Sequence, residues 1–280
     1  MRTIGKWTDP YLVAGPACIS FSGGRTSGYM LRQIVDAYGG VLPDNIMVVF
    51  ANTGKEREET LRFVHNFTAE WGIKVHWIEW RAGKPGFEEV GYNSASRVGE
   101  PFAALIAKKK FTPNWQMRFC TQYLKVQAMT DFMASKGFTK NTYRDAIGLR
   151  YDEGHRILKM FERNEKRQRQ CVAPLAKAHV ILATVMDFWK HQPFDLGLVP
   201  GEGNCDLCFL KGRRLRKELI RRRPDSVKWW ILQEQIGNGT FDRKDSYSEL
   251  TAEVRQSPDL FNMNEEHDVE CGLLCEPDTD

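Results

Sequence analysis

The chain has 280 residues, of which 42% are hydrophobic and 27% charged, and its formal net charge is +4 at pH 7. This length and apolar content allow a full core, either in one large α/β domain or in a domain with a smaller appendage. No signal-peptide pattern and no run of about 18 apolar residues is present, so we expect a soluble, cytosolic protein with no membrane partner. The modest charge argues neither for nor against nucleic acid as a ligand.

Short apolar strands alternate with amphipathic helices in the first eighty residues. The hydrophobic period predicts strands over 17–21, 46–51 and 74–80, and helices over 28–37 and 58–71. Repeated strand-helix-strand units of this length form right-handed crossovers. The predicted fold class is therefore α/β, a parallel sheet with helices on both faces, in which ligands bind at the carboxyl ends of the strands.

The later part of the chain is less regular. Glycines and a proline after residue 81, and the lack of period over 91–101, predict a loop or insertion. We divide the chain into a nucleotide-binding α/β domain (1–200) and a helical C-terminal region that contains the C-x-x-C motif (201–280), with a flexible tail from residue 257. The remaining predicted elements are helices over 121–136, 183–191 and 215–222 and a strand over 141–149.

The first strand ends in a sequence typical of an anion site, C-I-S-F-S-G-G-R-T-S over residues 18–27. The glycines Gly23 and Gly24 let an anion approach the backbone, and the following helix directs its N–H groups at it. An ordinary strand-to-helix turn is the alternative, and the Walker spacing is absent. The hydroxyl donors available to a phosphate or sulfate are Ser20, Ser22, Thr26 and Ser27.

The second strand ends in a similar way, at Asn52, Thr53 and Gly54. Because the carboxyl ends of neighbouring parallel strands lie at one edge of a sheet, two such ends predict a nucleotide crevice. A third candidate is the sequence after the strand at 141–149, where Gly148 is followed by Arg150 and Arg156. Paired guanidiniums suit phosphate or sulfate, although salt bridges to Asp152 or Glu153 are the alternative.

Seven cysteines in a cytosolic chain indicate metal or redox chemistry more than disulfides. Cys205 and Cys208 form a C-x-x-C, and the remote Cys120 can complete a site for zinc or an iron–sulfur cluster. Redox-active thiols share this spacing. A pair of buried or unreactive cysteines that bind no metal is the other alternative. Cys18 and Cys171 lie in apolar surroundings and are expected to be small buried hydrophobes.

Two further features bear on function. Cys271, in the tail, has the position of a nucleophile on a flexible segment, although an exposed cysteine without a role is the alternative. Basic residues concentrate over 211–223, and we interpret this run as a solvated helical face.

In this order the motifs resemble those of the adenosine 5′-phosphosulfate and 3′-phosphoadenosine 5′-phosphosulfate (PAPS) reductases, in the adenine nucleotide alpha hydrolase-like (PP-loop) superfamily. The resemblance covers most of the chain. The matching segments are 20–27 (S-x-S-G-G-x-x-S), 52–60 (D-T-G with a later E-T), Cys120 with Lys125, Gly148 with Arg150 and Arg156, 204–209 (G-C-x-x-C-T), and 270–274 (E-C-G-L-H).

The resemblance implies a mechanism and its partners. The thiolate of Cys271 would attack the sulfur of the bound phosphosulfate, leave an S-sulfonate on the enzyme and release the adenosine phosphate, after which thioredoxin or glutaredoxin would release sulfite. The loop at 22–27, Arg150, Arg156 and Lys125 would hold the anion. A 4Fe–4S cluster, or zinc, would be bound by Cys120, Cys205 and Cys208.

Three departures from the family pattern stand out. Phe119 replaces a cysteine, so three ligands align and the fourth position is left to Cys171, to Cys275 or to none. Leu274 replaces the histidine after the tail cysteine, and Asn52 replaces the aspartate before T-G.

Two other functions remain open. One is an ATP pyrophosphatase-type sulfurtransferase that acts on tRNA or DNA with a three-cysteine iron–sulfur cluster, although Thr26 replaces the aspartate usual in such loops. The other is a nucleotide-binding module with a structural or redox-sensing cluster. The number of subunits is also open, a homo-oligomer included.

Overall fold

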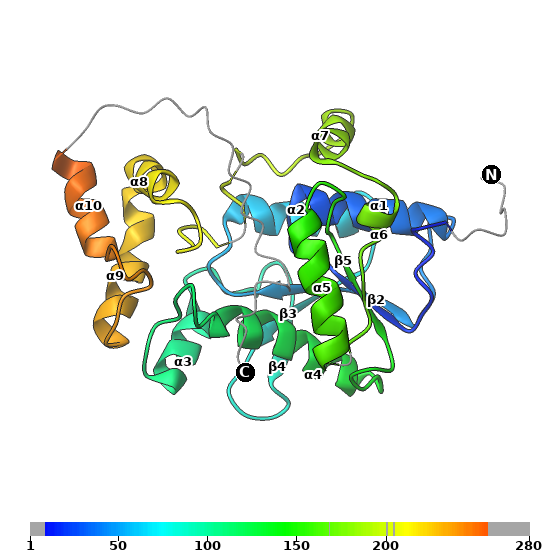
Figure 1. Cartoon of the computed structure of the whole chain (residues 1–280), viewed down its shortest axis with the longest axis horizontal. Helices are drawn as coiled ribbons and strands as arrows, with labels where there is room; N and C mark the ends of the chain where they lie inside the picture. Colours follow the sequence, from blue (N-terminus) through cyan, green and yellow to red (C-terminus); the bar gives the residue numbers. More distant parts are fainter. Residues whose placement is uncertain (1–8, 168, 200, 204, 257–280) are drawn as a thin grey trace.

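The computed structural model describes residues 9–256, except 168, 200 and 204 (Figure 1). Its centre is a sheet of the order β4-β3-β2-β1-β5-β6. All neighbouring strands are parallel except β3 and β4, which are antiparallel. The strands are β1 (Ala17–Ser20), β2 (Ile46–Asn52), β3 (Val75–Trp80), β4 (Phe87–Val90), β5 (Arg144–Ile147) and β6 (Cys171–Val172).

The helices cover both faces of this sheet, as the sequence predicted. Those assigned are α1 (Arg25–Ala37), α2 (Glu58–Ala69), α3 (Glu100–Lys109), α4 (Ala128–Ser135), α5 (Gly154–Arg167), α6 (Pro174–Lys177), α7 (Leu182–Lys190), α8 (Arg213–Arg222), α9 (Val227–Ile236) and α10 (Tyr247–Gln256). A π-helix, η1 (Thr121–Gln127), leads into α4, and a 3-10 turn, η2 (Pro224–Ser226), lies between α8 and α9. Within the described ranges, no helix has both the length and the apolar character needed to cross a membrane.

Side chains of the strands alternate between the two faces of the sheet, so each strand contributes to two hydrophobic layers. Ile19 and Phe50 pack on one face with α1, α2, α6 and α7. Cys18 and Val49 pack on the other with α3, η1, α4 and α5. The second layer continues without a break into α8, α9 and α10 through Leu219, Trp230 and Tyr247, among others. Figure 1 shows these three helices together at one end of the molecule.

Several predicted bounds differ from the structure. The helix expected over 28–37 begins at Arg25, and the strand expected over 141–149 is limited to Arg144–Ile147. The segment 121–136 divides into η1 and α4. The loop expected beyond residue 81 contains β4 on the outer side of β3, an edge strand too short for its alternation to be evident.

Candidate functional site

The loop between β1 and α1 closes tightly around its glycines. Gly23 has φ +77°, and a Cβ there would lie 2.7 Å from Cγ2 of Thr60, so both the conformation and the space require glycine. The Ser22 N–H donates to Ser27 Oγ at 3.2 Å, and the two hydroxyl oxygens lie 2.9 Å apart. This arrangement presents the N-terminus of α1, whose first N–H groups have no partner within the helix, to an anion.

The end of β5 lies against this loop. The Arg150 guanidinium, on a residue only 5% exposed, donates from Nη1 to Thr26 Oγ1 at 3.1 Å. A Cβ on Gly148 would lie 3.1 Å from the Cα of Ser27, so the approach of the two segments depends on glycine at 148. The structure thus brings together the loop and two of the predicted residues after β5, since β5 pairs directly with β1.

Three arginines near the loop are held by carboxylates. Arg150 Nε pairs with Asp152 Oδ1 at 3.0 Å, and its Nη1 lies 3.8 Å from Glu153 Oε2, so the salt bridges of the alternative interpretation are present. Arg156 forms an ion pair with Glu153, which is the arrangement that the alternative interpretation of this motif described. Arg25 pairs with Asp195, with Nη2 to Oδ2 at 2.5 Å, and donates from Nη1 to the carbonyl of Leu198. Through these two contacts, Arg25 holds the 195–198 segment against the first turn of α1. Anion binding by Arg156 stays a prediction.

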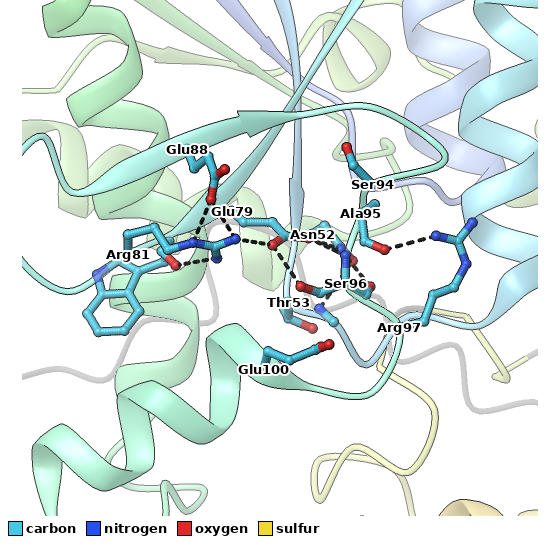
Figure 2. Close-up of polar contacts among 12 residues, drawn as sticks. Asn52, Thr53, Glu79, Arg81, Glu88, Ser94, Ala95, Ser96, Arg97 and Glu100 are labelled. Atoms are coloured by element: carbon cyan, nitrogen blue, oxygen red, sulfur yellow. Dashed lines mark hydrogen bonds and ion pairs between the residues drawn. The ribbon is translucent and has the colours of Figure 1, made fainter.

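At the end of β2, Asn52 belongs to a buried polar network. Its Nδ2 donates to Glu79 Oε1 at 2.6 Å, and its Oδ1 accepts the N–H of Gly54 at 3.1 Å. Figure 2 shows Arg81 and Ser96 converging on the same Glu79 carboxylate. An aspartate at 52, as in the PAPS reductase pattern, would face this carboxylate, so asparagine suits these surroundings better than aspartate does.

The next residues link β2 to the C-x-x-C segment. Thr53 Oγ1 lies 3.5 Å from the sulfur of Cys205, and Glu56 and Cys205 form an isolated antiparallel bridge. Asp206 donates its N–H to the carbonyl of Lys55 at 2.8 Å. The predicted nucleotide crevice and the predicted cysteine site thus share the segment 53–56.

The three predicted ligands line one small pocket, with about 20 Å³ of open volume, at the junction of η1 and the C-x-x-C segment. Cys120, Cys205 and Cys208 form part of its wall with Lys125. Over the part of the chain that the structure describes, no three cysteine, histidine or acidic side chains are close enough to hold a metal ion. The pocket also has an apolar lining, made by Phe102, Leu124, Phe209, Leu210 and Trp230.

Buried charges surround these thiols. Burial, together with the Glu56 carboxylate, raises the pKa of Cys205, while Lys125 acts in the opposite direction. Burial raises the pKa of Glu56 as well, against the effects of Lys125 and of the hydrogen bonds from Thr53. A buried thiol of this kind is a metal ligand only after it loses its proton, so a metal ion that bound here would displace protons.

Lys211 organises the C-x-x-C segment from inside. This lysine is 2% exposed, and burial lowers its pKa. Its Nζ donates to four backbone carbonyls, those of Glu202 (3.2 Å), Gly203 (2.9 Å), Cys205 (2.7 Å) and Asp206 (3.2 Å). The ammonium also lies near enough to Cys205 and Cys208 to interact with their charge. The sequence does not predict that Lys211 donates to these carbonyls. Its position three residues after Cys208 is the one feature that points to it.

The basic run at 211–223 is only in part the predicted solvated face, since Arg213, Arg214, Arg222 and Arg223 are exposed. Lys211 and Arg216 are buried, and Arg216 Nη2 pairs with Asp242 at 2.5 Å. On α8 and just after it, the more exposed members of the run pair with carboxylates. These pairs are Arg213 with Asp245 and Glu253, Lys217 with Glu253, Arg221 and Arg222 with Glu218, and Arg223 with Glu59.

Other predicted residues lie apart from this site or outside the described residues. Ser20 ends β1, and its hydroxyl lies 3.8 Å from the Met129 sulfur. Cys271 and Cys275 lie outside the described residues, as does the predicted flexible tail. Cys18 is fully buried, as expected, and burial raises the pKa of its thiol.

Cys171 belongs to a different part of the molecule. It is buried on β6, where its sulfur lies 4.0 Å from Asp145 Oδ2. It lines an apolar cavity of about 610 Å³ beside α5 and α6 and not the pocket of the other three cysteines. Cys171 as a fourth ligand is therefore wrong, because β6 and β2 are separated in the sheet by β5 and β1.

The chain is 30% identical over 201 residues to an uncharacterized nin region protein, ORF290, of Escherichia phage lambda. The matched region covers 69% of this chain and 65% of the phage protein, so the chain spans slightly less than two thirds of that relative's length. No family model matches the chain.

Proposed function

We propose that this protein is a sulfonucleotide reductase-like enzyme of the adenine nucleotide alpha hydrolase-like fold, which forms sulfite from adenosine phosphosulfate or its 3′-phosphorylated form. One observation carries the proposal: the C-x-x-C segment meets the end of β2 at Thr53 and Cys205, and β2 pairs directly with β1, the strand that leads into the oxyanion loop. Such an arrangement suits an enzyme that holds a nucleotide oxyanion next to sulfur chemistry.

The residues around the loop have defined tasks in this reaction. The N-terminus of α1, the Thr26 hydroxyl and Arg150 hold the nucleotide's oxyanion, and Arg150 neutralises charge that develops on the departing phosphate. The Cys271 thiolate attacks the sulfur, the bond between sulfur and the bridging phosphate oxygen breaks, and the adenosine phosphate leaves with the electron pair. A reduced dithiol of the thioredoxin or glutaredoxin class then forms a disulfide and releases sulfite. We assign this thiol chemistry to the reducing cytosol.

The type and number of the cysteines support an iron–sulfur cluster or zinc, although their sulfurs would have to move closer together to hold it. Three cysteines from two distant segments line one pocket, and the buried ammonium of Lys211 interacts favourably with the thiolate forms of Cys205 and Cys208. Cys120, Cys205 and Cys208 would bind the group. Zinc would supply Lewis acidity beside the crevice, and an iron–sulfur cluster would supply a polarisable group that accepts electrons.

The test is an anaerobic assay of sulfite release. The purified protein is given reduced thioredoxin with each phosphosulfate separately, and Cys271→Ser is compared with the matched variant Cys275→Ser. We expect sulfite from one of the two substrates, complete loss of activity in C271S and retention in C275S. Activity that survives in C271S would contradict the proposed nucleophile.

The sulfurtransferase alternative has less support. Its nucleic-acid substrate would need free cations, whereas the arginines of α8 are largely engaged by Glu218, Asp242, Asp245 and Glu253. Hydrolysis of ATP to AMP and pyrophosphate, with no sulfite from either phosphosulfate, would favour this alternative over the reductase.

A further inference from the structure

Arg57 is a buried arginine whose side chain lacks the partners that such a charge requires. It precedes α2 and is 5% exposed, yet its Nε and Nη2 have no hydrogen-bond partner, and the structure gives both atoms essentially no contact with solvent. A buried donor left without a partner costs about 1–3 kcal/mol, and more when it is charged. Such a group in a native protein therefore calls for an explanation, and a bound anion is the simplest.

A second unpaired donor lies one turn away and borders the oxyanion loop. Thr60 is fully buried, and its Oγ1 also lacks a partner. Cγ2 of the same side chain lies 2.7 Å from the point where a Cβ on Gly23 would be. The Thr60 N–H donates to the Arg57 carbonyl at 2.9 Å, which fixes the two residues on one turn.

The carboxylates around Arg57 are paired with other cations. Glu59 accepts from Arg223 at 2.9 Å, and Asp206 pairs with Lys55 at 3.1 Å. The remaining one, Glu202, lies 3.8 Å from Arg222. These carboxylates interact with Arg57 at longer range, but none of them accepts a hydrogen bond from its Nε or Nη2.

We infer that Arg57 and Thr60 form a second oxyanion site, between the Gly23 turn and the cysteine segment, for a ligand that places a first oxyanion in the 22–27 loop. The inference rests on nucleotide binding in the proposed function and not on its redox chemistry. The ligand is a nucleotide with two acidic groups. These groups are either adjacent, as in a phosphosulfate or diphosphate, or on opposite sides of a ribose.

Calorimetric titration with three nucleotides tests this site. It also distinguishes a ligand with two adjacent acidic groups from one whose acidic groups lie on opposite sides of the ribose. Adenosine 5′-monophosphate carries one acidic group, adenosine 5′-diphosphate carries two adjacent groups, and adenosine 3′,5′-bisphosphate carries two separated ones. We expect the wild type to bind one of the two larger ligands about 10-fold more tightly than the monophosphate, since charge-assisted hydrogen bonds have this magnitude. Arg57→Met should lose that difference and leave the affinity for the monophosphate within about 2-fold.

Arg62→Met is the matched control, because Arg62 is an exposed arginine on α2. It should keep the wild-type preference. Without ligand, Arg57→Met should melt at or above the wild-type temperature, since it removes an unpaired buried charge. Equal ligand preference in wild type and Arg57→Met, an equal loss in Arg62→Met, or a wild type without any preference would overturn the site. Because sulfite is not measured, the reductase proposal can fail while this inference stands.

Discussion

Arg150 and Thr26 are 124 residues apart in the chain, and Arg150 Nη1 donates a hydrogen bond of 3.1 Å to Thr26 Oγ1. The contact joins the segment after β5 to the first turn of α1. It places a buried guanidinium beside helix N–H groups, a combination suited to an oxyanion.

Replacing Arg150 should weaken nucleotide binding. In Arg150→Met, we expect the affinity for adenosine 5′-monophosphate to fall about 10-fold or more, because a charged hydrogen bond to phosphate contributes about 1.5–3 kcal/mol. Titration calorimetry measures the change. Arg144→Met is the matched control, since Arg144 is the first residue of β5, at its opposite end, and donates to the Ala14 carbonyl. Equal losses in both variants would argue against a direct contact with the phosphate.

The Asn52–Glu79 hydrogen bond predicts a large loss of stability when Asn52 is replaced by aspartate. Asn52→Asp places a second carboxylate where Nδ2 now lies 2.6 Å from Glu79 Oε1, in a fully buried position. At pH 7 we expect the free energy of unfolding to fall by about 3–5 kcal/mol, as for a broken buried ion pair. Urea denaturation measures this loss. Adding Glu79→Gln should recover much of it, and a double variant no more stable than the single one would contradict the assigned repulsion.

The cysteine pocket predicts which thiols hold a metal. We expect Cys120→Ser, Cys205→Ser and Cys208→Ser to lose bound iron, or zinc, because each variant removes a third of the protein's ligands. Cys18→Ser and Cys171→Ser should keep the wild-type content, since these residues lie elsewhere in the sheet. Metal analysis and absorption spectra of anaerobically purified protein give the answer. Loss of metal in Cys171→Ser, or retention in Cys205→Ser, would contradict the assignment.

The Arg25–Asp195 pair predicts a pH-dependent contribution to stability. Burial acts to raise the pKa of Asp195, but the hydrogen-bonded Arg25 guanidinium outweighs it and holds the pKa below its usual value. Because the pKa is lowered in the folded state, the stabilisation is present above about pH 5 and disappears as the pH falls toward about 3. The side chain of Asp195 is 39% exposed, so we expect no more than about 1 kcal/mol.

Urea denaturation of wild type and Asp195→Asn between pH 3 and 7 measures this contribution. The difference between them should shrink on acidification. Asp187→Asn is the control, because the Asp187–Lys190 pair is widely separated at 3.7 Å and largely exposed. A difference that does not change with pH would show that Asp195 acts through its shape and not its charge.

Part of the fold could be predicted from local pattern. β2 is a continuous apolar run, and the apolar residues of α2 recur at helical spacing, so both were predicted nearly to their ends. α9 was missed because its apolar side chains, including Trp229, Trp230 and Leu232, do not form one stripe. β6 has two residues and α6 four, too short for any period to be evident.

The residues of the candidate site also divide into those that the sequence predicts and those that it does not. Glycines and hydroxyls at strand ends, and cysteines at metal-ligand spacing, are visible in the sequence because their chemistry depends on residue type and short spacing. The roles of Lys211, Glu56 and Arg57 were not visible, since each depends on burial and on partners brought close by folding.

The sequence by itself determined the parallel α/β architecture and the segments that carry chemistry, because periodicity and local turn residues act over a few positions. Only the tertiary structure decided that Arg150 meets Thr26, that Thr53 meets Cys205 and that Cys171 lies at the far edge of the sheet. The order of strands in a sheet sets these distances, and that order results from the burial of both faces at once, a property of the whole chain.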